Sequence, residues 1–241
     1  MKTRASPRPS RMKARKDTPA LLIESGIVLF GARGYDGVTT RELAHGARTN
    51  ISSIKYHFGG KEELYRAVLQ EIIYEIKELV GPLLLALRNG VAEANGNQDV
   101  LTRLARQFAE GWCRAALGDP RTQMRIPPIV RELIQPSRHF KVIYNGFFRV
   151  LYEVLGELLA AAHGQTAVDQ QLQIRTHIIM NVVWGFIYTE SLLWHRMGWN
   201  GYNRNRIEAI VPVLSDAFVL SIGLATKPAG GVRRRQRPGR T

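Results

Sequence analysis

The 241-residue chain has a single cysteine and lacks the long apolar runs typical of membrane proteins. Cys113 alone cannot form an intrachain disulfide, which favours a reducing cytoplasmic setting. No stretch of 18 or more apolar residues is free of charge, because Glu190 and Asp216 interrupt the best candidates. The N-terminus carries cations without an apolar core behind them, so it does not resemble a secretory signal. We therefore expect no membrane partner.

Common catalytic and cofactor motifs are also missing. The glycines at 31, 34 and 37 have the wrong spacing for a dinucleotide fingerprint, and Glu62 replaces the hydroxyl residue that a P-loop needs after Gly60-Lys61. Neither G-x-S-x-G nor H-E-x-x-H occurs. The histidines of the second half of the chain, His139, His163, His177 and His195, lack the short spacing of a metal site. The sequence predicts no enzyme, no cofactor and no metal.

Acidic residues are absent from both ends of the chain. Residues 1–16 hold seven bases and residues 227–241 hold six, and these account for most of the net charge of +14. Both tails are predicted to be disordered when free. The N-terminal arm could follow DNA phosphates or enter a minor groove, although a solubilising tail is the alternative. The C-terminal tail has no preferred role, and residues 17–226 are nearly neutral.

Two short helices joined by a tight turn are predicted between Thr39 and Leu64. Thr40 is a candidate cap for the first helix, and Leu43, Ala44 and Ala47 form its apolar stripe. Asn50 ends the turn and is a good N-cap for a second helix over Ile51–His57. Gly59-Gly60 ends that helix.

The second short helix has one apolar and one polar face. Ile54 and Phe58 lie four residues apart and are predicted to face inward. Ser52, Ser53, Lys55 and Tyr56 remain for solvent or for a DNA duplex. Helices this short need a scaffold, and an apolar helix over Asp17–Arg33 supplies one. We predict a helix-turn-helix DNA-binding domain over residues 17–64, whose last helix enters the major groove.

These positions resemble the DNA-binding signature of the TetR family of bacterial regulators. The resemblance covers about 45 residues: Phe30, Gly34-Tyr35, Thr39 to Ala44, Ile54 to Phe58, and Lys61 to Leu64. The segments Tyr56 to Glu62, Arg131 to Pro136 and Met197 to Trp199 are similar to the CecR-like subgroup. One departure is Arg48-Thr49, where family members commonly have Gly-Val.

The resemblance implies roles for single residues. Thr40, Tyr56 and Lys61 would contact DNA phosphates, and His57 would lie near the backbone at the end of the recognition helix. Ser52, Ser53 and Lys55 would face base edges. For Tyr56 and His57 the alternative is packing, and for Lys61 it is a solvated surface position.

The patterns of residues 65–226 are helical throughout, so the fold class is all-α, with the helix-turn-helix domain followed by a helical ligand-binding and dimerisation domain. The predicted helices span 61–87 with a kink at Gly81-Pro82, then 99–117, 129–134, 137–162, 168–197 and 204–225. The last two helices are apolar on more than one face. This pattern favours a homodimer that pairs through these helices, with a monomer holding a deeply buried helix pair as the alternative.

The resemblance also implies a small-molecule effector bound in the second domain. The near-neutral domain favours an apolar or aromatic compound. The aromatic residues of the domain are candidates for lining the pocket, although most are expected to be core: Trp112, Phe140, Tyr144, Phe147, Phe148, Tyr152, Trp184 and Tyr188. The sequence therefore predicts a ligand-responsive dimeric repressor that binds double-stranded DNA at a palindromic operator. The alternative is a non-specific nucleic-acid-binding or architectural protein driven by its tails, which would lose all sequence preference when both tails are deleted.

Overall fold

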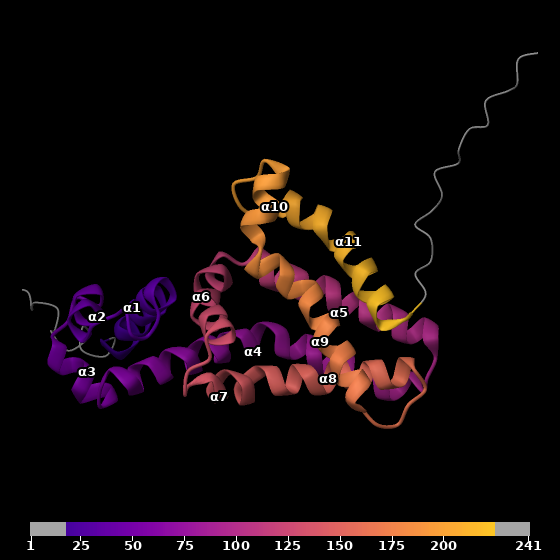
Figure 1. Ribbon diagram of the computed structural model, residues 1–241, viewed down its shortest axis with the longest axis horizontal. Helices are drawn as coiled ribbons and strands as arrows, with labels where there is room; N and C mark the ends of the chain where they lie inside the picture. Colours follow the sequence, from indigo (N-terminus) through magenta and orange to yellow (C-terminus); the bar gives the residue numbers. More distant parts are fainter. Residues whose placement is uncertain (1–17, 225–241) are drawn as a thin grey trace, which may run out of the picture.

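The computed structural model describes residues 18–224, and these residues are helical with no strand, as predicted (Figure 1). The predicted basic arm, residues 1–16, and the predicted basic tail, residues 227–241, lie outside the described residues. None of the helices within residues 18–224 is long and apolar enough to cross a bilayer.

The N-terminal unit consists of three helices and the start of a fourth. Their bounds are α1 Thr18–Arg33, α2 Thr40–Gly46, α3 Ile51–Phe58 and α4 Lys61–Ala94. A single buried set joins them, in which Leu22, Phe30, Leu43, Ile54 and Leu64 contribute one side chain or more from each helix. Because α4 continues past residue 64, the predicted boundary between the two domains falls inside a helix.

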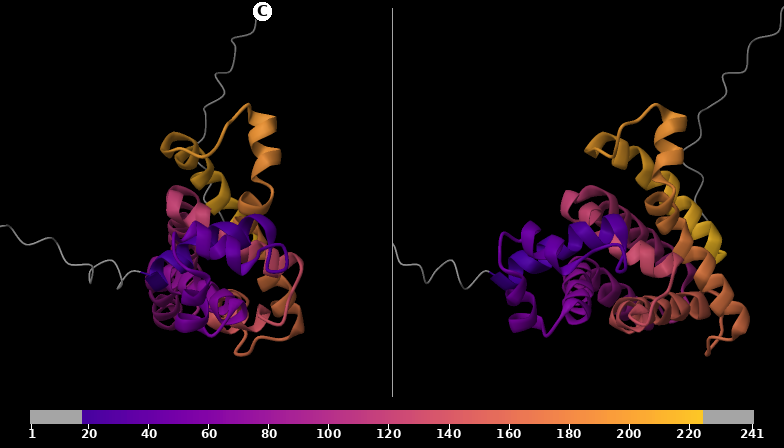
Figure 2. Two further views of the ribbon diagram at one scale, coloured as in Figure 1. Left: turned by 90° about the vertical axis from the view of Figure 1, so that its left-hand side faces the viewer. Right: turned by 60° about the vertical axis from the view of Figure 1, so that its left-hand side comes forward.

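The remaining helices form a bundle in which α5 packs against both α4 and α11. They are α5 Gln98–Gly118, α6 Pro120–Ile134, α7 Phe140–Ile143, the π-helix η1 Tyr144–Phe148, α8 Arg149–Ala162, α9 Gln170–Tyr188, α10 Glu190–Met197 and α11 Arg204–Ile222. Helix α11 packs against α5 and α9, and α4 packs against α5 and α8. Figures 1 and 2 show α1–α3 at one end of the molecule, away from α10 and α11.

Several predicted boundaries were wrong. Helix α4 extends beyond residue 87 and continues through Pro82. Helix α6 begins at Pro120 rather than at 129, with Pro127 and Pro128 inside it. The π-helix separates α7 from α8 within the predicted 137–162 helix, and Thr189 separates α9 from α10 within the predicted 168–197 helix.

Helix α6 connects the two parts of the molecule. It packs against α1 on one side and against α5 on another. At Gly31 of α1, an added Cβ atom would lie 3.2 Å from both Pro127 and Pro128, so the two helices approach closely there. Arg131 donates hydrogen bonds to the carbonyls of Gly31, at 2.7 Å, and Ala32. A movement of α6 would therefore displace α1 or break these contacts.

Candidate nucleic-acid interface

Helix α2 begins with a reciprocal cap. The Thr39 hydroxyl accepts from the Glu42 backbone N–H, and the Glu42 carboxylate accepts from the Thr39 backbone N–H. Thr39, not Thr40, is thus the capping residue, and Thr40 is the first helical residue. A hydrogen bond from Arg33 and then the bonds from Thr39 lower the pKa of Glu42 to about 2. Arg33 also ties the end of α1 to α2.

Helix α3 begins at the predicted residue, Ile51, and is followed by the predicted glycine. The Asn50 side chain accepts from the Ser52 backbone N–H at 3.2 Å, and Gly59 ends the helix with φ +84°, a left-handed conformation that suits glycine. Phe58, not His57, is its last residue. Ile54 is only 1% exposed and anchors the helix in the N-terminal core.

The opposite face of α3 is open to solvent. Ser52, Lys55 and His57 are exposed, and the Tyr56 side chain is 84% exposed. Packing therefore does not explain Tyr56, which removes the alternative of a half-buried core residue. The Tyr56 and His57 rings meet edge to face, with centroids 4.8 Å apart.

Ser53 differs from its neighbours because it is half-buried. Its Oγ lies 3.0 Å from the Thr49 Oγ1, so part of its hydrogen-bonding capacity is already used within the turn. This contact gives a physical reason for threonine at position 49. Among the three predicted base-contacting residues, Ser52 and Lys55 are the more accessible.

Arg48 occupies the first position past the cap of α2 with φ +51°, a left-handed conformation that is costly for most residues with a Cβ atom, asparagine and aspartate being the exceptions. Its backbone N–H donates to the His45 carbonyl at 2.9 Å, which closes the turn. The Arg48 side chain is exposed, close in sequence to the start of α3. The backbone of the turn is thus strained at Arg48, and glycine at this position would relieve the strain.

Lys61 is held in place at the start of α4. Its Nζ lies 4.2 Å from the centroid of the Tyr35 ring, a cation–π contact that the sequence reading did not identify. Gly60, the N-cap residue, offers no side-chain hydrogen bond, so the first backbone N–H groups of α4 lack a side-chain acceptor. A cation beside free N–H groups is a suitable environment for a phosphate. The acids of this first turn are paired: Glu62 with Arg138 and Glu63 with Arg66.

An open hollow on this side of the molecule joins the start of α1 to α3. Its walls are formed by Thr18, Thr49, Ser52, Ser53, Tyr56 and His57. Thr18 was not identified from the sequence as part of the surface, because nothing local signals that α1 begins beside α3. Four of the seven predicted DNA-contacting positions line this hollow, and a fifth, Lys55, lies on the same helix, α3.

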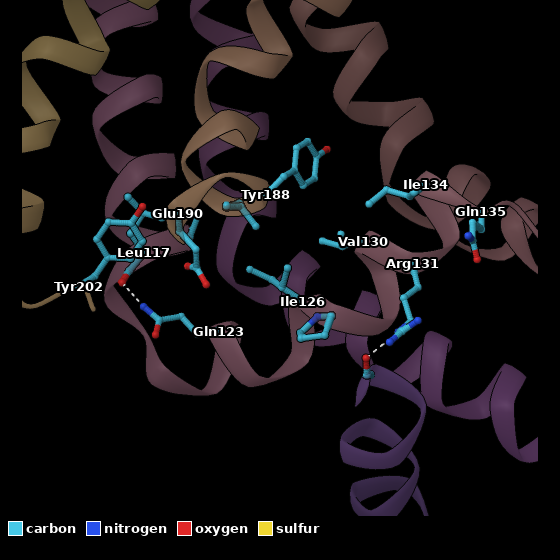
Figure 3. Close-up of a pocket in the computed structure, with 14 residues that line it drawn as sticks. Leu117, Gln123, Ile126, Val130, Arg131, Ile134, Gln135, Tyr188, Glu190 and Tyr202 are labelled. Carbon is cyan, nitrogen blue, oxygen red and sulfur yellow. Dashed lines mark hydrogen bonds between the residues drawn. The ribbon is translucent and has the colours of Figure 1, made fainter. Parts of the chain in front are cut away.

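A second concave feature is a cavity of about 430 Å³ bordered by α1, α5, α6, α9, α10 and Tyr202. Ile126, Val130 and Ile134 supply much of its apolar wall, and Arg131 lies at the side that faces α1 (Figure 3). Gly31 of α1 also lines it. A molecule in this cavity would contact α6 and the end of α1 together.

The predicted pocket aromatics are dispersed, and only Tyr188 lines this cavity. Trp184 stacks on Tyr188 with ring centroids 5.3 Å apart and also contacts Phe148. The Tyr152 hydroxyl and the His177 Nδ1 form a short hydrogen bond. The other predicted residues lie elsewhere: Trp112 packs on Phe108, Phe140 stacks near Tyr144, and Phe147 borders a smaller cavity of about 170 Å³.

Residues 18–224 contain no group of three or more histidine, cysteine or acidic side chains that could hold a metal ion. Cys113 is buried, and burial raises the pKa of its thiol to about 12. A thiol with so high a pKa is inert at neutral pH, which argues against a redox role.

Comparison with known proteins supports the interpretation of α2 and α3 as a DNA-binding unit. Residues 22–68 match the model of bacterial regulatory proteins of the tetR family, and residues 101–224 match the C-terminal domain of the HTH-type transcriptional dual regulator CecR. The CecR protein of Shigella flexneri is 26% identical over 189 residues, which cover 78% of this chain and 84% of that protein.

Solved structures share the fold. A TetR-like transcriptional regulator from Rhodococcus sp. RHA1 has a TM-score of 0.58 at 13% identity, covering 90% of this chain and 99% of that one. HlyIIR, a hemolysin II transcriptional regulator, has a TM-score of 0.55 at 20% identity, covering 88% and 99%. With the second family model matching just over half of its length, this chain belongs to the TetR family of transcriptional regulators, with a C-terminal domain of the CecR type, and is a DNA-binding regulator rather than an enzyme.

Proposed function

We propose that the protein is a cytoplasmic homodimeric repressor that reads a palindromic operator through α3 and is released by a small molecule. The observation that carries the DNA-binding part is the division of α3 into a buried anchor, Ile54, and an exposed face with Ser52, Lys55 and Tyr56. Regulators of this family bind DNA, act as dimers and respond to small-molecule effectors. The division into domains over 17–64 and 65–226 belongs to the same proposal.

In this proposal Ser52, Ser53 and Lys55 face base edges, since lysine can donate to guanine and serine to several bases. Thr40, Tyr56, His57 and Lys61 contact phosphates. The helix start at Thr40, the exposed Tyr56 hydroxyl and the fixed Lys61 ammonium suit that role. The N-terminal arm would add phosphate contacts, because Thr18 lies in the same hollow as Ser52.

The test is operator binding by variants of α3. Once selection from random duplexes gives the operator, Lys55→Ala is expected to weaken binding by about 1–3 kcal/mol and to relax the preference at one base pair in each half-site. Tyr56→Ala is expected to weaken binding about equally for all sequences, because a phosphate contact carries no sequence information. Quantitative gel shifts at fixed salt measure both effects.

The matched control is Lys77→Ala, which removes an exposed cation from α4 outside α3. It should bind like the parent, and circular dichroism should show all variants folded. Parental affinity and specificity in both α3 variants would contradict the proposed DNA face.

A dimer through α9 and α11 is supported by apolar residues that the single chain leaves uncovered. Each of the two helices has a buried face and an exposed apolar one. The apolar residues that are more than half exposed are Ile174, Ile178, Val213 and Leu220. Helices α9 and α11 pack side by side, so the four residues belong to one helix pair. A face of this kind suits a two-fold contact with a second copy.

Release by a ligand is supported by the position of the cavity against both α6 and α1. A ligand shifts an equilibrium only if it binds one arrangement better than the other. Here it could do so by separating Arg131 from the carbonyls of Gly31 and Ala32, which changes how α1 is held. The recognition helix would then be carried to a different spacing.

The strained turn gives an additional prediction. Arg48→Gly is expected to stabilise the fold by about 0.5–1 kcal/mol, since relief of the left-handed strain exceeds the extra chain entropy of glycine when unfolded. It should also lower operator affinity and reduce the salt dependence by about one released counterion per half-site, because a cation is lost. Urea denaturation and salt-titrated binding measure these changes.

Arg48→Asn is the control, because asparagine tolerates the same conformation without glycine's flexibility. The Arg48→Asn variant should be more stable than the parent, and the salt dependence of its operator binding should fall as much as in Arg48→Gly. A loss of stability in both variants would show that the Arg48 side chain has a structural role in the turn.

A further inference from the structure

The cavity beside α6 contains a carboxylate that no described cation neutralises. Glu190 begins α10 and lines the cavity, and Figure 3 shows its carboxyl group directed into the space bordered by α6. Within residues 18–224 it forms no ion pair or side-chain hydrogen bond, and burial is the sole cause that raises the pKa of its carboxyl above the usual range. The start of a helix favours the charged form. The cavity therefore holds a partly desolvated negative charge.

The cationic residue of the cavity is already committed elsewhere. Arg131 directs its guanidinium toward α1, where the Gly31 and Ala32 carbonyls accept its hydrogen bonds. Gln123 is also engaged, since its side-chain nitrogen donates to the Leu117 carbonyl at 2.7 Å. Arg131 therefore does not neutralise Glu190, and Gln123 does not donate a hydrogen bond to it.

Aromatic and apolar groups line the same cavity as the carboxylate. Tyr188, in the cavity wall, stacks on Trp184, and the hydroxyl of Tyr202, a second ring in the wall, donates to the Phe186 carbonyl at 2.6 Å. Phenol rings attract cations through their faces, and an apolar wall removes water that would screen the attraction. An anionic guest would be repelled by Glu190, and a neutral guest would leave its charge desolvated and unpaired.

We infer that this cavity binds an amphipathic organic cation, whose apolar body lies against α6 and whose positive nitrogen lies beside Glu190, in a wall that also contains the rings of Tyr188 and Tyr202. The inference rests on the proposed ligand response and names the chemical class of the effector. The sequence predicted an apolar or aromatic effector, and the inference adds that this effector carries a positive charge.

The test is isothermal titration of the full-length protein without DNA, using three probes that share a naphthalene ring. They are 2-naphthylmethyl-trimethylammonium, its neutral isostere with carbon in place of nitrogen, and 2-naphthylacetate. The cation is expected to bind about tenfold or more tightly than the neutral isostere, and the anion should bind weakest. Glu190→Gln should remove the preference for the cation, because it weakens binding of the cation and relieves the neutral isostere of the cost of burying an unpaired charge.

Glu93→Gln is the matched control, since Glu93 is an exposed acid of α4 outside the cavity. It should retain the full preference. The inference is overturned if the parent protein fails to bind the cation, if it binds the neutral isostere or the anion as tightly, or if Glu190→Gln keeps the preference for the cation. The parent measurement is decisive even if Glu190→Gln does not fold.

Operator release is measured separately, by adding the cation to the protein–DNA complex. Binding that depends on Glu190 without release would refute the proposed effector response but retain the cation site. Release that is unchanged in Glu190→Gln would retain ligand response but overturn the cation site.

Discussion

Replacing Val213 by aspartate is expected to convert the protein from a dimer into a monomer and to weaken operator binding by about two orders of magnitude. Val213 is 68% exposed in the single chain, so the substitution should change the stability of the protomer by no more than about 0.5 kcal/mol. In the proposed two-fold interface the same residue is buried in both copies. The new carboxylate would be desolvated twice without a partner, at a cost of several kcal/mol.

The loss of DNA affinity follows because a monomer lacks the second DNA-binding domain of the dimer. A dimer binds its second half-site at a high effective concentration, whereas a monomer must bind each half-site independently. Sedimentation equilibrium should report a mass near 27.2 kDa for the variant and twice that mass for the parent. Gel shifts with a full operator and with a half-site should then give similar affinities for the variant.

Leu85→Asp is the control for this experiment. Leu85 is 61% exposed on α4, so the substitution introduces the same carboxylate on an exposed apolar position outside α9 and α11. This variant should remain a dimer. A Val213→Asp variant that dimerises as strongly as the parent would exclude the α9–α11 interface.

Features set by neighbouring residues could be predicted from the sequence. Asn50, Ile54 and Gly59 determine the start, the buried face and the end of α3 within ten residues, and the structure has each of them as expected. The choice between Thr39 and Thr40 was wrong, because both are adjacent hydroxyl residues and Glu42 decides between them through its bond to Thr39.

Features set by distant residues could not be predicted. Pro127 and Pro128 suggested a helix start because proline lacks a backbone N–H, yet α6 continues through them while they pack on Gly31. Helix α9 ends at Thr189, where the backbone leaves the helical conformation with φ −113° and ψ +20°, and no glycine or proline at that position signals the break. The cavity, too, depends on residues as far apart in the chain as Gly31 and Tyr202.

The largest loss of stability is expected from Glu132, a buried acid at the junction of the two parts of the molecule. The residue is 3% exposed, although carboxylates are rarely buried without partners. Its Oε1 accepts from the Tyr65 hydroxyl at 2.7 Å, and its Oε2 accepts from the Ser137 backbone N–H at 3.1 Å. Burial and this bond to Glu132 raise the pKa of Tyr65. The network joins α4 to the end of α6 and the segment before α7.

Glu132→Ala is therefore expected to destabilise the fold by about 3–5 kcal/mol, because it strands the Tyr65 hydroxyl and the Ser137 N–H and leaves a cavity. Urea denaturation at equal protomer concentration measures the loss, since a dimer's stability depends on concentration. Tyr65→Phe should cost about 1–2 kcal/mol, because Ser137 still donates to the carboxylate.

Glu132→Gln distinguishes hydrogen bonding from charge at this site. A glutamine amide can turn its oxygen toward the Ser137 N–H and its nitrogen toward the Tyr65 and Ser137 hydroxyls, both of which can accept. The loss should then stay near that of Tyr65→Phe. If Glu132→Gln is as damaging as Glu132→Ala, the negative charge itself is required, and if Glu132→Ala is as mild as Tyr65→Phe, the network does not hold α6 against α4. Helix α6 also borders the cavity and packs against α1, so the Glu132 network fixes the end of the helix through which the proposed ligand response would pass.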